Sequence, residues 1–211
     1  MTRVGAIILA AGQSSRFRAG GGMGPTKLVA KLDGKPIVRR VVEAALATKA
    51  RPIVVVTGYA RDSVEAALAD LDVAAAFNPK FASGLASSLS VGLAAVPRDV
   101  AGALVLLGDM PLIEPRLADA LIEAFLAREG ALAAIPLTEG RRGNPVLLGR
   151  SLFEAALRLK GDEGARKLIG ALNEGELVEV EASDMGVTFD VDTPEDLAAA
   201  QRLAGGANFS H

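Results

Sequence analysis

The sequence of 211 residues predicts an α/β domain with a doubly wound, mostly parallel sheet. Apolar runs typical of strands alternate with segments of helical periodicity along most of the chain. The runs at 4–10 and 101–107 are continuously apolar, which is typical of parallel strands buried on both faces. Half of the residues are hydrophobic but only 4% are aromatic, so the core must consist of aliphatic side chains and alanine. We expect a single domain over 1–204 and a disordered tail over 205–211.

Each expected element of the N-terminal half follows from a run of apolar residues and a turn signal that ends it. We expect strands where the run is short and continuously apolar, at 4–10, 27–32, 52–57 and 73–77. We expect helices where apolar residues recur every three or four positions, at 36–46, 63–71 and 84–95. Pro36 suits the first turn of its helix, because proline lacks an N–H group that a helix start leaves unpaired anyway.

The C-terminal half continues the alternation with one interruption. Strands are expected at 101–107, 132–136, 144–148, 177–180 and 187–191. Helices are expected at 115–128, 151–159, 165–172 and from 193 onward. The polar segment 138–145 predicts a small antiparallel excursion, and the charged run 160–167 is interpreted as a surface turn. Thr193 is a suitable N-cap for the last helix, with Pro194 in its first position.

Composition excludes several classes of function. The formal net charge is −2 and basic residues are dispersed, so we expect neither nucleic acid nor a membrane surface as a partner. The chain has no Cys and its only His is His211, which excludes thiolate metal sites and histidine-dependent triads. No apolar stretch approaches the roughly 20 residues of a membrane span, and no signal-peptide cleavage site is evident, so we expect a cytoplasmic protein. Catalysis would then depend on carboxylates, cations, backbone donors and bound metal.

The strongest functional signal is the loop after the first strand. Small residues let backbone N–H groups approach an anion closely, and Arg16 and Lys27 supply cations that neutralise phosphate charge. The spacing matches neither a Walker loop nor a dinucleotide fingerprint, and an ordinary tight turn stays open as the alternative. The candidate nucleotide-binding residues here are Leu9, Ala10, Ala11, Gly12, Ser14, Ser15, Arg16 and Lys27.

Acidic residues follow two other expected strands. Asp109 comes directly after Gly108, whose missing side chain permits close approach of a ligand. Asp190 and Asp192 are two positions apart, so in an extended segment both carboxylates face the same side. Mg²⁺ prefers one or two carboxylates together with phosphate oxygens and waters, which makes these residues candidate metal ligands. The alternatives are that Asp109 caps a turn and that Asp192 caps the last helix.

Two further segments are weaker candidates for binding. Gly84, Ser87 and Ser88 belong to a run of small and hydroxyl residues at an expected helix start, where exposed N–H groups favour an anion or the edge of a base. A serine-capped helix explains the same pattern. Arg142 and Asn144 lie in a segment that can hold a second anionic ligand, although exposed arginine pairs are usually only solvated.

Together these motifs resemble the MobA-like nucleotidyltransferases, and among them the molybdenum cofactor cytidylyltransferases of the MocA type. The resemblance runs from about residue 4 to residue 203. It is carried by six segments in the family's order, at 9–16, 26–28, 84–89, 108–111, 142–145 and 190–196. The sequence departs from the family by an insertion at 19–22, and by Asn144 where a His is common.

The resemblance implies a Rossmann-like nucleotidyltransferase fold and a defined reaction. CMP would be transferred from CTP to the terminal phosphate of molybdopterin, with release of pyrophosphate. The Ala-Ala-Gly turn at 10–12 accompanies cytidylyl transfer in the family, whereas Ala-Gly-Gly accompanies guanylyl transfer. A phosphate oxygen of the acceptor attacks the α-phosphorus in line, so the reaction needs no side-chain nucleophile and no His.

The resemblance also implies roles for individual residues. Arg16, Lys27 and Asp109 would be catalytic, with the loop after the first strand holding the triphosphate. Asp109 would bind Mg²⁺, which Mn²⁺ could replace, and Asp190 or Asp192 would be the second acidic ligand. The residues implied to bind nucleotide from the later segments are Gly84, Ser87, Ser88 and Gly108, and those implied to bind the acceptor are Arg142 and Asn144.

Two other functions stay open at this level. One is guanylyl or cytidylyl transfer to another phosphorylated acceptor. The other is a nucleotide-binding maturation factor that performs no catalysis and acts on a client molybdoenzyme.

Overall fold

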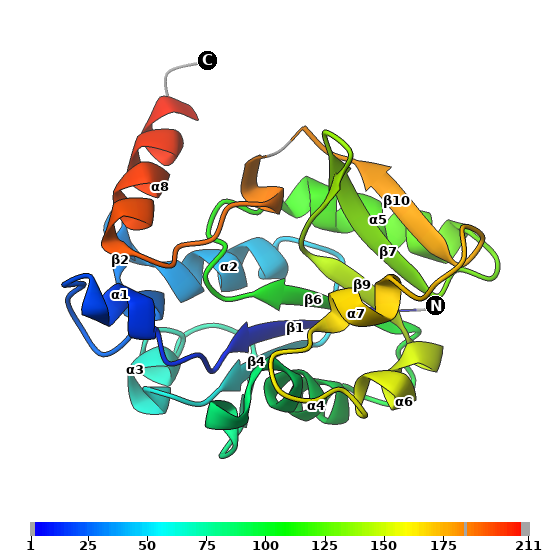
Figure 1. The fold of residues 1–211 in the computed structure, drawn as a ribbon, viewed down its shortest axis with the longest axis horizontal. Helices are drawn as coiled ribbons and strands as arrows, with labels where there is room; N and C mark the ends of the chain where they lie inside the picture. The colour runs from blue at the N-terminus through cyan, green and yellow to red at the C-terminus, as the bar shows by residue number, and fades with distance from the viewer. Residues whose placement is uncertain (1–2, 184, 208–211) are drawn as a thin grey trace.

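A mixed sheet of eight strands forms the centre of the computed structural model, which describes residues 3–183 and 185–207 (Figure 1). Seven strands follow one another across the sheet in the order β10 (Leu177–Glu181), β7 (Ala133–Thr138), β9 (Val146–Gly149), β6 (Gly102–Leu107), β1 (Val4–Ala10), β4 (Ile53–Thr57) and β5 (Ala74–Phe77). The eighth strand, β8 (Arg141–Arg142), pairs with β7.

The sheet is mostly parallel, as expected. β1 pairs in parallel with β4 and β6, and β4 pairs in parallel with β5. β9 is antiparallel to both β6 and β7, and β8 is antiparallel to β7. The antiparallel excursion expected from the polar segment at 138–145 is therefore confirmed, and it separates β6 from the parallel pair of β7 and β10.

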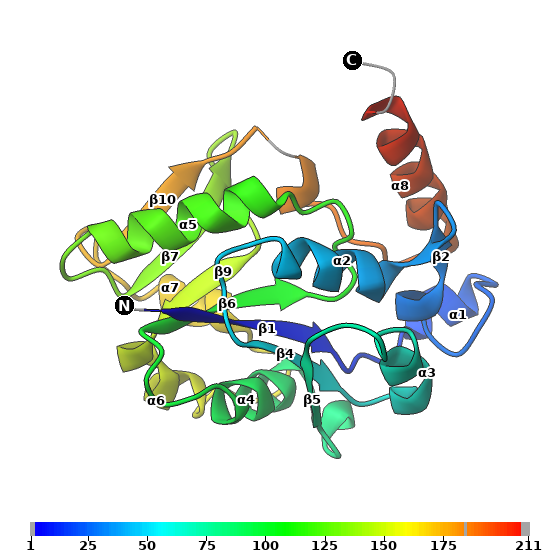
Figure 2. The ribbon, with the colours of Figure 1, turned by 180° about the vertical axis from the view of Figure 1, so that it is seen from behind.

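Helices cover both faces of the sheet. On one face lie α2 (Ile37–Leu46) and α5 (Pro115–Ala127), seen in front in Figure 2. On the other face lie α4 (Leu85–Ala95), α6 (Phe153–Ala156) and α7 (Ala165–Ile169), seen in front in Figure 1. Alternate residues of β1 enter the two cores: Ile8 packs with α2 and α5, whereas Ile7 packs with α4. The doubly wound class is confirmed.

A smaller apolar cluster fixes the elements beside the first loop. Phe17 of α1 (Ser15–Ala19) packs with Leu32, Ile37, Val191 and with Ala200 of α8 (Pro194–Ala207). Of the tail expected at 205–211, residues 205–207 are the last turn of α8 and 208–211 lie outside the described residues. In the described part of the chain, no helix is long and apolar enough to cross a membrane.

Two expected strands are wrong. The segment 27–32 instead begins with a 3₁₀ turn at Lys27–Val29, followed by β2 (Lys31–Leu32), which pairs only with β3 (Lys35–Pro36). Both edges of β1 are already taken by β4 and β6, so this segment cannot join the main sheet beside β1.

The second wrong strand is the one expected at 187–191. A 3₁₀ turn at Met185–Val187 leads instead into an irregular segment that extends to α8. Its backbone bonds run to two loops: the Val191 N–H donates to the Asp109 carbonyl and the Val187 carbonyl accepts from the Asn144 N–H, both at 2.9 Å. Three expected helices are also shorter or shifted, namely α3 (Arg61–Ala66), α6 and α7.

Candidate functional site

Three chain segments meet at the carboxyl ends of β1 and β6. The Gly108 N–H donates to the Leu9 carbonyl at 3.0 Å, which extends the pairing of the two strands to their last residues. A Cβ at position 108 would lie 3.0 Å from that same carbonyl oxygen, so glycine permits the approach. The bond from Val191 to the Asp109 carbonyl then attaches the third segment. Sequence reasoning placed candidate residues on all three segments, and the structure brings them together.

A cluster of opposite charges lies at this junction. Lys27 Nζ is 2.7 Å from Asp109 Oδ2 and 2.6 Å from Asp192 Oδ1. Arg16 Nη1 is 2.5 Å from Asp192 Oδ2. Burial alone would lower the pKa of Lys27, but the carboxylates of Asp109 and Asp192 outweigh it and hold that pKa above its ordinary value. Lys27 is therefore charged throughout the neutral range.

Asp190 completes a group of three carboxylates. Asp109, Asp190 and Asp192 each offer an oxygen atom, and these atoms lie within 4.8 Å of one another. Burial and repulsion from Asp109 and Asp192 raise the pKa of Asp190, and within the described residues its side chain has no ion-pair partner. The cluster therefore contains three carboxylates but only two cationic side chains, those of Arg16 and Lys27. Closely spaced carboxylate oxygens with uncompensated charge fit a hard divalent cation, so these residues can hold Mg²⁺ or Mn²⁺.

The alternative role for Asp192, capping of the last helix, belongs to a different residue. The Thr193 N–H donates to Asp196 Oδ2 at 2.8 Å, and the Asp196 N–H donates to Thr193 Oγ1 at 3.2 Å. This reciprocal pair satisfies the start of α8 in the manner of a capping box. The carboxylate of Asp192 is left to the charge cluster.

A second set of contacts anchors Lys27 to the loop after β1. Ser14 has a left-handed backbone conformation, with φ at 53°. Its Oγ lies 2.8 Å from Thr26 Oγ1 and accepts the Lys27 N–H at 3.2 Å. Thr26 is fully buried and its hydroxyl oxygen accepts the Leu28 N–H at 3.3 Å. These hydrogen bonds fix the backbone of Lys27 relative to the loop after β1.

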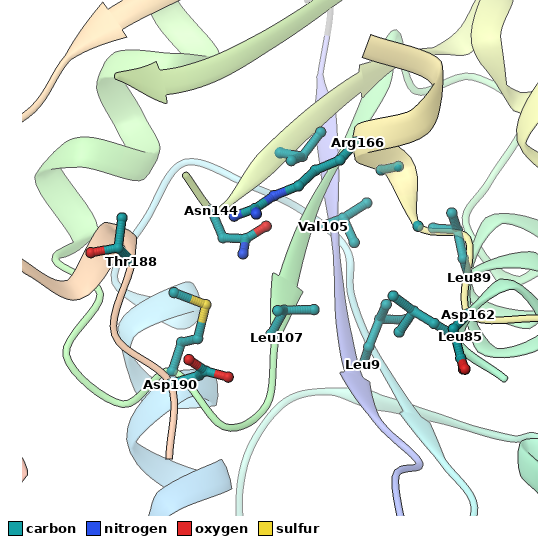
Figure 3. Close-up of a pocket in the computed structure, with 14 residues that line it drawn as sticks. Leu9, Leu85, Leu89, Val105, Leu107, Asn144, Asp162, Arg166, Thr188 and Asp190 are labelled. Carbon is teal, nitrogen blue, oxygen red and sulfur yellow. The ribbon is translucent and has the colours of Figure 1, made fainter. Parts of the chain in front are cut away.

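Two cavities open on either side of the charge cluster. The Lys27 cavity measures about 510 Å³ and is lined by Leu9, Ala11, Gly12, Gln13, Ser14, Ser15, Lys27, Leu28, Phe81, Ala82, Gly84, Leu85, Ser88, Leu107, Asp109 and Asp162. The Asn144 cavity measures about 420 Å³, has an apolar floor that includes Leu9, Val105 and Leu107, and carries Asn144 and Asp190 on its rim (Figure 3). Four residues belong to both cavities: Leu9, Leu85, Leu107 and Asp162.

The expected binding residues fall into two groups. Most of them line the Lys27 cavity: Leu9, Ala11, Gly12, Ser14, Ser15, Lys27, Gly84 and Ser88. Three others do not line this cavity. Ala10 is buried in β1, Gly108 is buried against β1, and the Ser87 hydroxyl is bonded to backbone carbonyls. Arg16 lies on α1 with its side chain 76% exposed and reaches the site through Asp192.

The two residues expected to bind an acceptor are separated by the fold. Asn144 lines the cavity named after it. Arg142 lies on β8, where its Nε donates to Glu179 Oε1 at 2.7 Å, and it lines a different hollow that also includes Arg128. The structure does not bring Arg142 to the charge cluster.

Sequence reasoning missed the segment at 160–167, which it interpreted as a surface turn. Asp162 lines both cavities, and Arg166 extends over the Asn144 cavity toward Asn144 (Figure 3). Within the described residues, the Arg166 guanidinium has no hydrogen bond or ion pair. The signal available in the sequence was the pair of glycines at 161 and 164, because Gly161 adopts a positive φ and its carbonyl accepts the Ala86 N–H at 3.0 Å.

The contact between Gly84 and Gly161 gives a first prediction. Gly84 has φ at 103°, and a Cβ there would lie 2.3 Å from the carbonyl carbon and oxygen of Gly161. We expect Gly84→Ala to lower the free energy of unfolding by about 1–3 kcal/mol and to weaken nucleotide binding. Gly175→Ala is the matched control, because nothing lies within 4 Å of its Cβ position. Urea unfolding of both variants checks this, and equal stability of the two would contradict it.

Comparison with known proteins agrees with this geometry. A family model described as the MobA-like NTP transferase domain matches residues 6–177. The molybdenum cofactor cytidylyltransferase of Escherichia coli is 28% identical over 207 residues, which cover 95% of this chain and 97% of that protein. A nucleotidyl transferase of Methanothermobacter has a similar structure, with a TM-score of 0.85, 25% identity and coverage of 99% of this chain and 100% of that one.

A second group of relatives is larger than this chain. The bifunctional protein GlmU of Sorangium cellulosum is 32% identical over 166 residues, which cover 76% of this chain but 34% of GlmU. The chain thus spans about a third of the length of that relative. The family model matches most of the chain, and the two cavities around a charge cluster are consistent with it. The chain therefore belongs to the MobA-like NTP transferase family.

Proposed function

We propose that this protein transfers CMP from CTP to the terminal phosphate of a molybdopterin-type acceptor and releases pyrophosphate, with Mg²⁺ or Mn²⁺ as cofactor. The proposal is supported by the meeting of two cavities at one acidic cluster, because Asp109 lines the Lys27 cavity and Asp190 lines the Asn144 cavity. A transfer between two substrates needs two sites that share the reacting centre. The relative from Escherichia coli, whose name is that of a molybdenum cofactor cytidylyltransferase, matches almost the whole chain and supports the choice of substrates.

The Lys27 cavity is the proposed nucleotide site. Lys27, Ser14 and Ser15 line it beside Asp109, so a triphosphate there would meet a cation and polar residues at its charged end. Ala11 lines the same cavity and is 97% buried. A methyl group at this position, which the Ala-Gly-Gly turn lacks, would leave less room for a base and so favour a pyrimidine over the larger guanine.

The Asn144 cavity is the proposed acceptor site. Its floor of aliphatic side chains suits a flat ring system, while Asn144 and Arg166 offer hydrogen-bond donors at the opposite rim from Asp190 (Figure 3). An acceptor that lies across this floor would direct its phosphate toward Asp190 and the acidic cluster. Arg142 has no part in this proposal, because it faces another hollow.

The residues of the chain would promote an in-line displacement at the α-phosphorus. Asp109 with Asp190 or Asp192 would hold a metal ion, which when bound would neutralise charge on phosphate oxygens. Lys27 would exchange its carboxylate partners for the triphosphate, and Arg16 would stabilise the leaving pyrophosphate. Because the phosphate of the acceptor is already anionic, no general base is needed to generate the nucleophile.

A pyrophosphate-release assay tests this proposal. CTP, GTP, UTP and ATP are each supplied with Mg²⁺, with and without molybdopterin. We expect release to require both CTP and molybdopterin, and to be at least tenfold faster with CTP than with GTP. Release with CTP and a different phosphorylated acceptor would refute the acceptor assignment, and CTP binding without turnover on any acceptor would favour a maturation factor that performs no catalysis.

A further inference from the structure

The side chain of Asn78 organises the wall of the Lys27 cavity from behind. Asn78 follows β5 directly and is 99% buried. Its Oδ1 accepts the Lys80 N–H at 2.9 Å, and its Nδ2 donates to Ser87 Oγ at 2.9 Å and to Ser88 Oγ at 3.0 Å. The carboxamide therefore links the end of a strand to the first turn of α4.

These contacts fix the direction of each hydrogen bond. A backbone N–H can only donate, so the atom that faces Lys80 must be the carboxamide oxygen and the atom that faces the serines must be the NH₂ group. Both hydrogens of that group are used, which makes both serine oxygens acceptors. The hydroxyl protons of Ser87 and Ser88 must then be donated elsewhere.

The two hydroxyl protons have different destinations. Ser87 Oγ lies 2.8 Å from the Gly84 carbonyl oxygen and 3.0 Å from the Lys80 carbonyl oxygen, so its proton has an acceptor in the backbone. For Ser88, the described part of the chain provides no such acceptor. Ser88 lines the Lys27 cavity and Ser87 does not. The Ser88 hydroxyl is thus held as a hydrogen-bond donor available to whatever fills that cavity.

We infer that Asn78 is a positioning residue for base selection, which acts by making Ser88 a donor toward the nucleotide. The inference rests on the placement of the nucleotide in the Lys27 cavity under the proposed function. The Watson–Crick edge of cytosine presents two adjacent acceptors, O2 and N3, which can receive this proton. The corresponding edge of guanine presents two adjacent donors, N1–H and N2–H, and a single acceptor, O6, so a proton donor at the position of cytosine O2 and N3 would oppose the N–H groups of guanine.

The substitution Asn78→Asp inverts this arrangement without changing the size of the side chain. An aspartate would still accept the Lys80 N–H, but it would also accept the protons of the two serines. Ser88 would then turn an oxygen lone pair toward the base instead of a proton. We expect the affinity for CTP to fall roughly tenfold while the affinity for GTP stays level or rises.

The test measures dissociation constants of CTP and GTP in the presence of Mg²⁺ and without acceptor, for the full chain and four variants. Ser88→Ala should weaken CTP binding about as much as Asn78→Asp does, whereas Ser87→Ala should change it less than twofold. The decisive comparison is the double variant: in the Ser88→Ala background, Asn78→Asp should have little further effect on CTP binding. A merely structural role for Asn78 would give the same loss in both backgrounds.

The outcomes separate this inference from the proposed function. An unchanged ratio of CTP to GTP affinity in Asn78→Asp, with wild-type thermal stability, overturns the inference even if the wild-type protein transfers CMP. A wild-type preference for GTP over CTP overturns the proposed base. It also overturns the Asn78 inference, because a Ser88 donor should favour cytosine. If Asn78→Asp does not fold, Asn78→Ala replaces it and should lower the ratio of CTP to GTP affinity. In the Ser88→Ala background, Asn78→Ala should likewise have little further effect on CTP binding.

Discussion

Replacing Asp109 with asparagine is expected to lower pyrophosphate release by about 10²–10³-fold at saturating CTP and Mg²⁺. Asp109 stands at the end of β6 with its carboxylate 2.7 Å from Lys27 and within reach of Asp190 and Asp192. The amide keeps the shape of the side chain but removes one negative charge from the proposed metal site. Initial rates of pyrophosphate release across a range of Mg²⁺ concentrations measure this loss. Higher Mg²⁺ should restore the rate of the variant only in part.

Asp99→Asn is the matched control for this experiment. Asp99 lies just before the other end of β6, where it pairs with Arg3 on the surface at 2.6 Å. Loss of that exposed pair should leave turnover unchanged. Full turnover by Asp109→Asn, or an equal loss in both variants, would mean that the three carboxylates do not hold the catalytic metal.

Replacing Lys27 with methionine is expected to lower turnover but to strengthen the binding of metal. Lys27→Met should weaken turnover with Mg²⁺ and CTP by roughly 10²-fold, because the proposed triphosphate site loses its buried cation. The same change should tighten the binding of free Mn²⁺, in the absence of nucleotide, by about three- to tenfold. The Lys27 ammonium group is bonded to both Asp109 and Asp192, so it would compete with a metal ion for their oxygens.

Titration of Mn²⁺ followed by electron paramagnetic resonance measures the second part directly. Lys167→Met is a suitable control, because Lys167 pairs with Glu163 on the surface and does not line either cavity. Weaker Mn²⁺ binding by Lys27→Met would contradict competition between Lys27 and the metal. It would indicate that Lys27 holds the carboxylates in the arrangement the metal needs.

The sequence predicted best those parts of the fold that depend on burial of short apolar runs. The strand at 4–10 was predicted with its observed bounds, because every one of its residues is buried and pairing is available on both sides. The segment expected to form a strand at 187–191 alternates apolar and polar residues, and its backbone instead finds hydrogen bonds in loops at Asp109 and Asn144. Apolar composition reports burial, and it does not report whether an edge of a sheet is free.

The site was predictable where residues follow strands and less so elsewhere. Asp109, Asp190 and Asp192 were expected near one another and are. Arg142 was expected beside Asn144, but the short strand β8 turns its side chain to Glu179 on another surface. Asp162 and Arg166 were missed because a run of charges on the surface has the same composition as a charged rim of a cavity, and only the contact of Gly161 with Gly84 distinguishes them.

We propose that the nucleotide and the acceptor each occupy one cavity and that their reacting groups meet at the acidic cluster. A crystal structure of the full chain with Mn²⁺ and a CTP analogue that cannot be hydrolysed between the α- and β-phosphates would show this arrangement. We predict anomalous scattering from Mn²⁺ between Asp109 and Asp190 or Asp192, with cytosine beside Ser88 in the Lys27 cavity and the Asn144 cavity left open for the acceptor. Cytosine in the Asn144 cavity, or Mn²⁺ away from these three carboxylates, would contradict it.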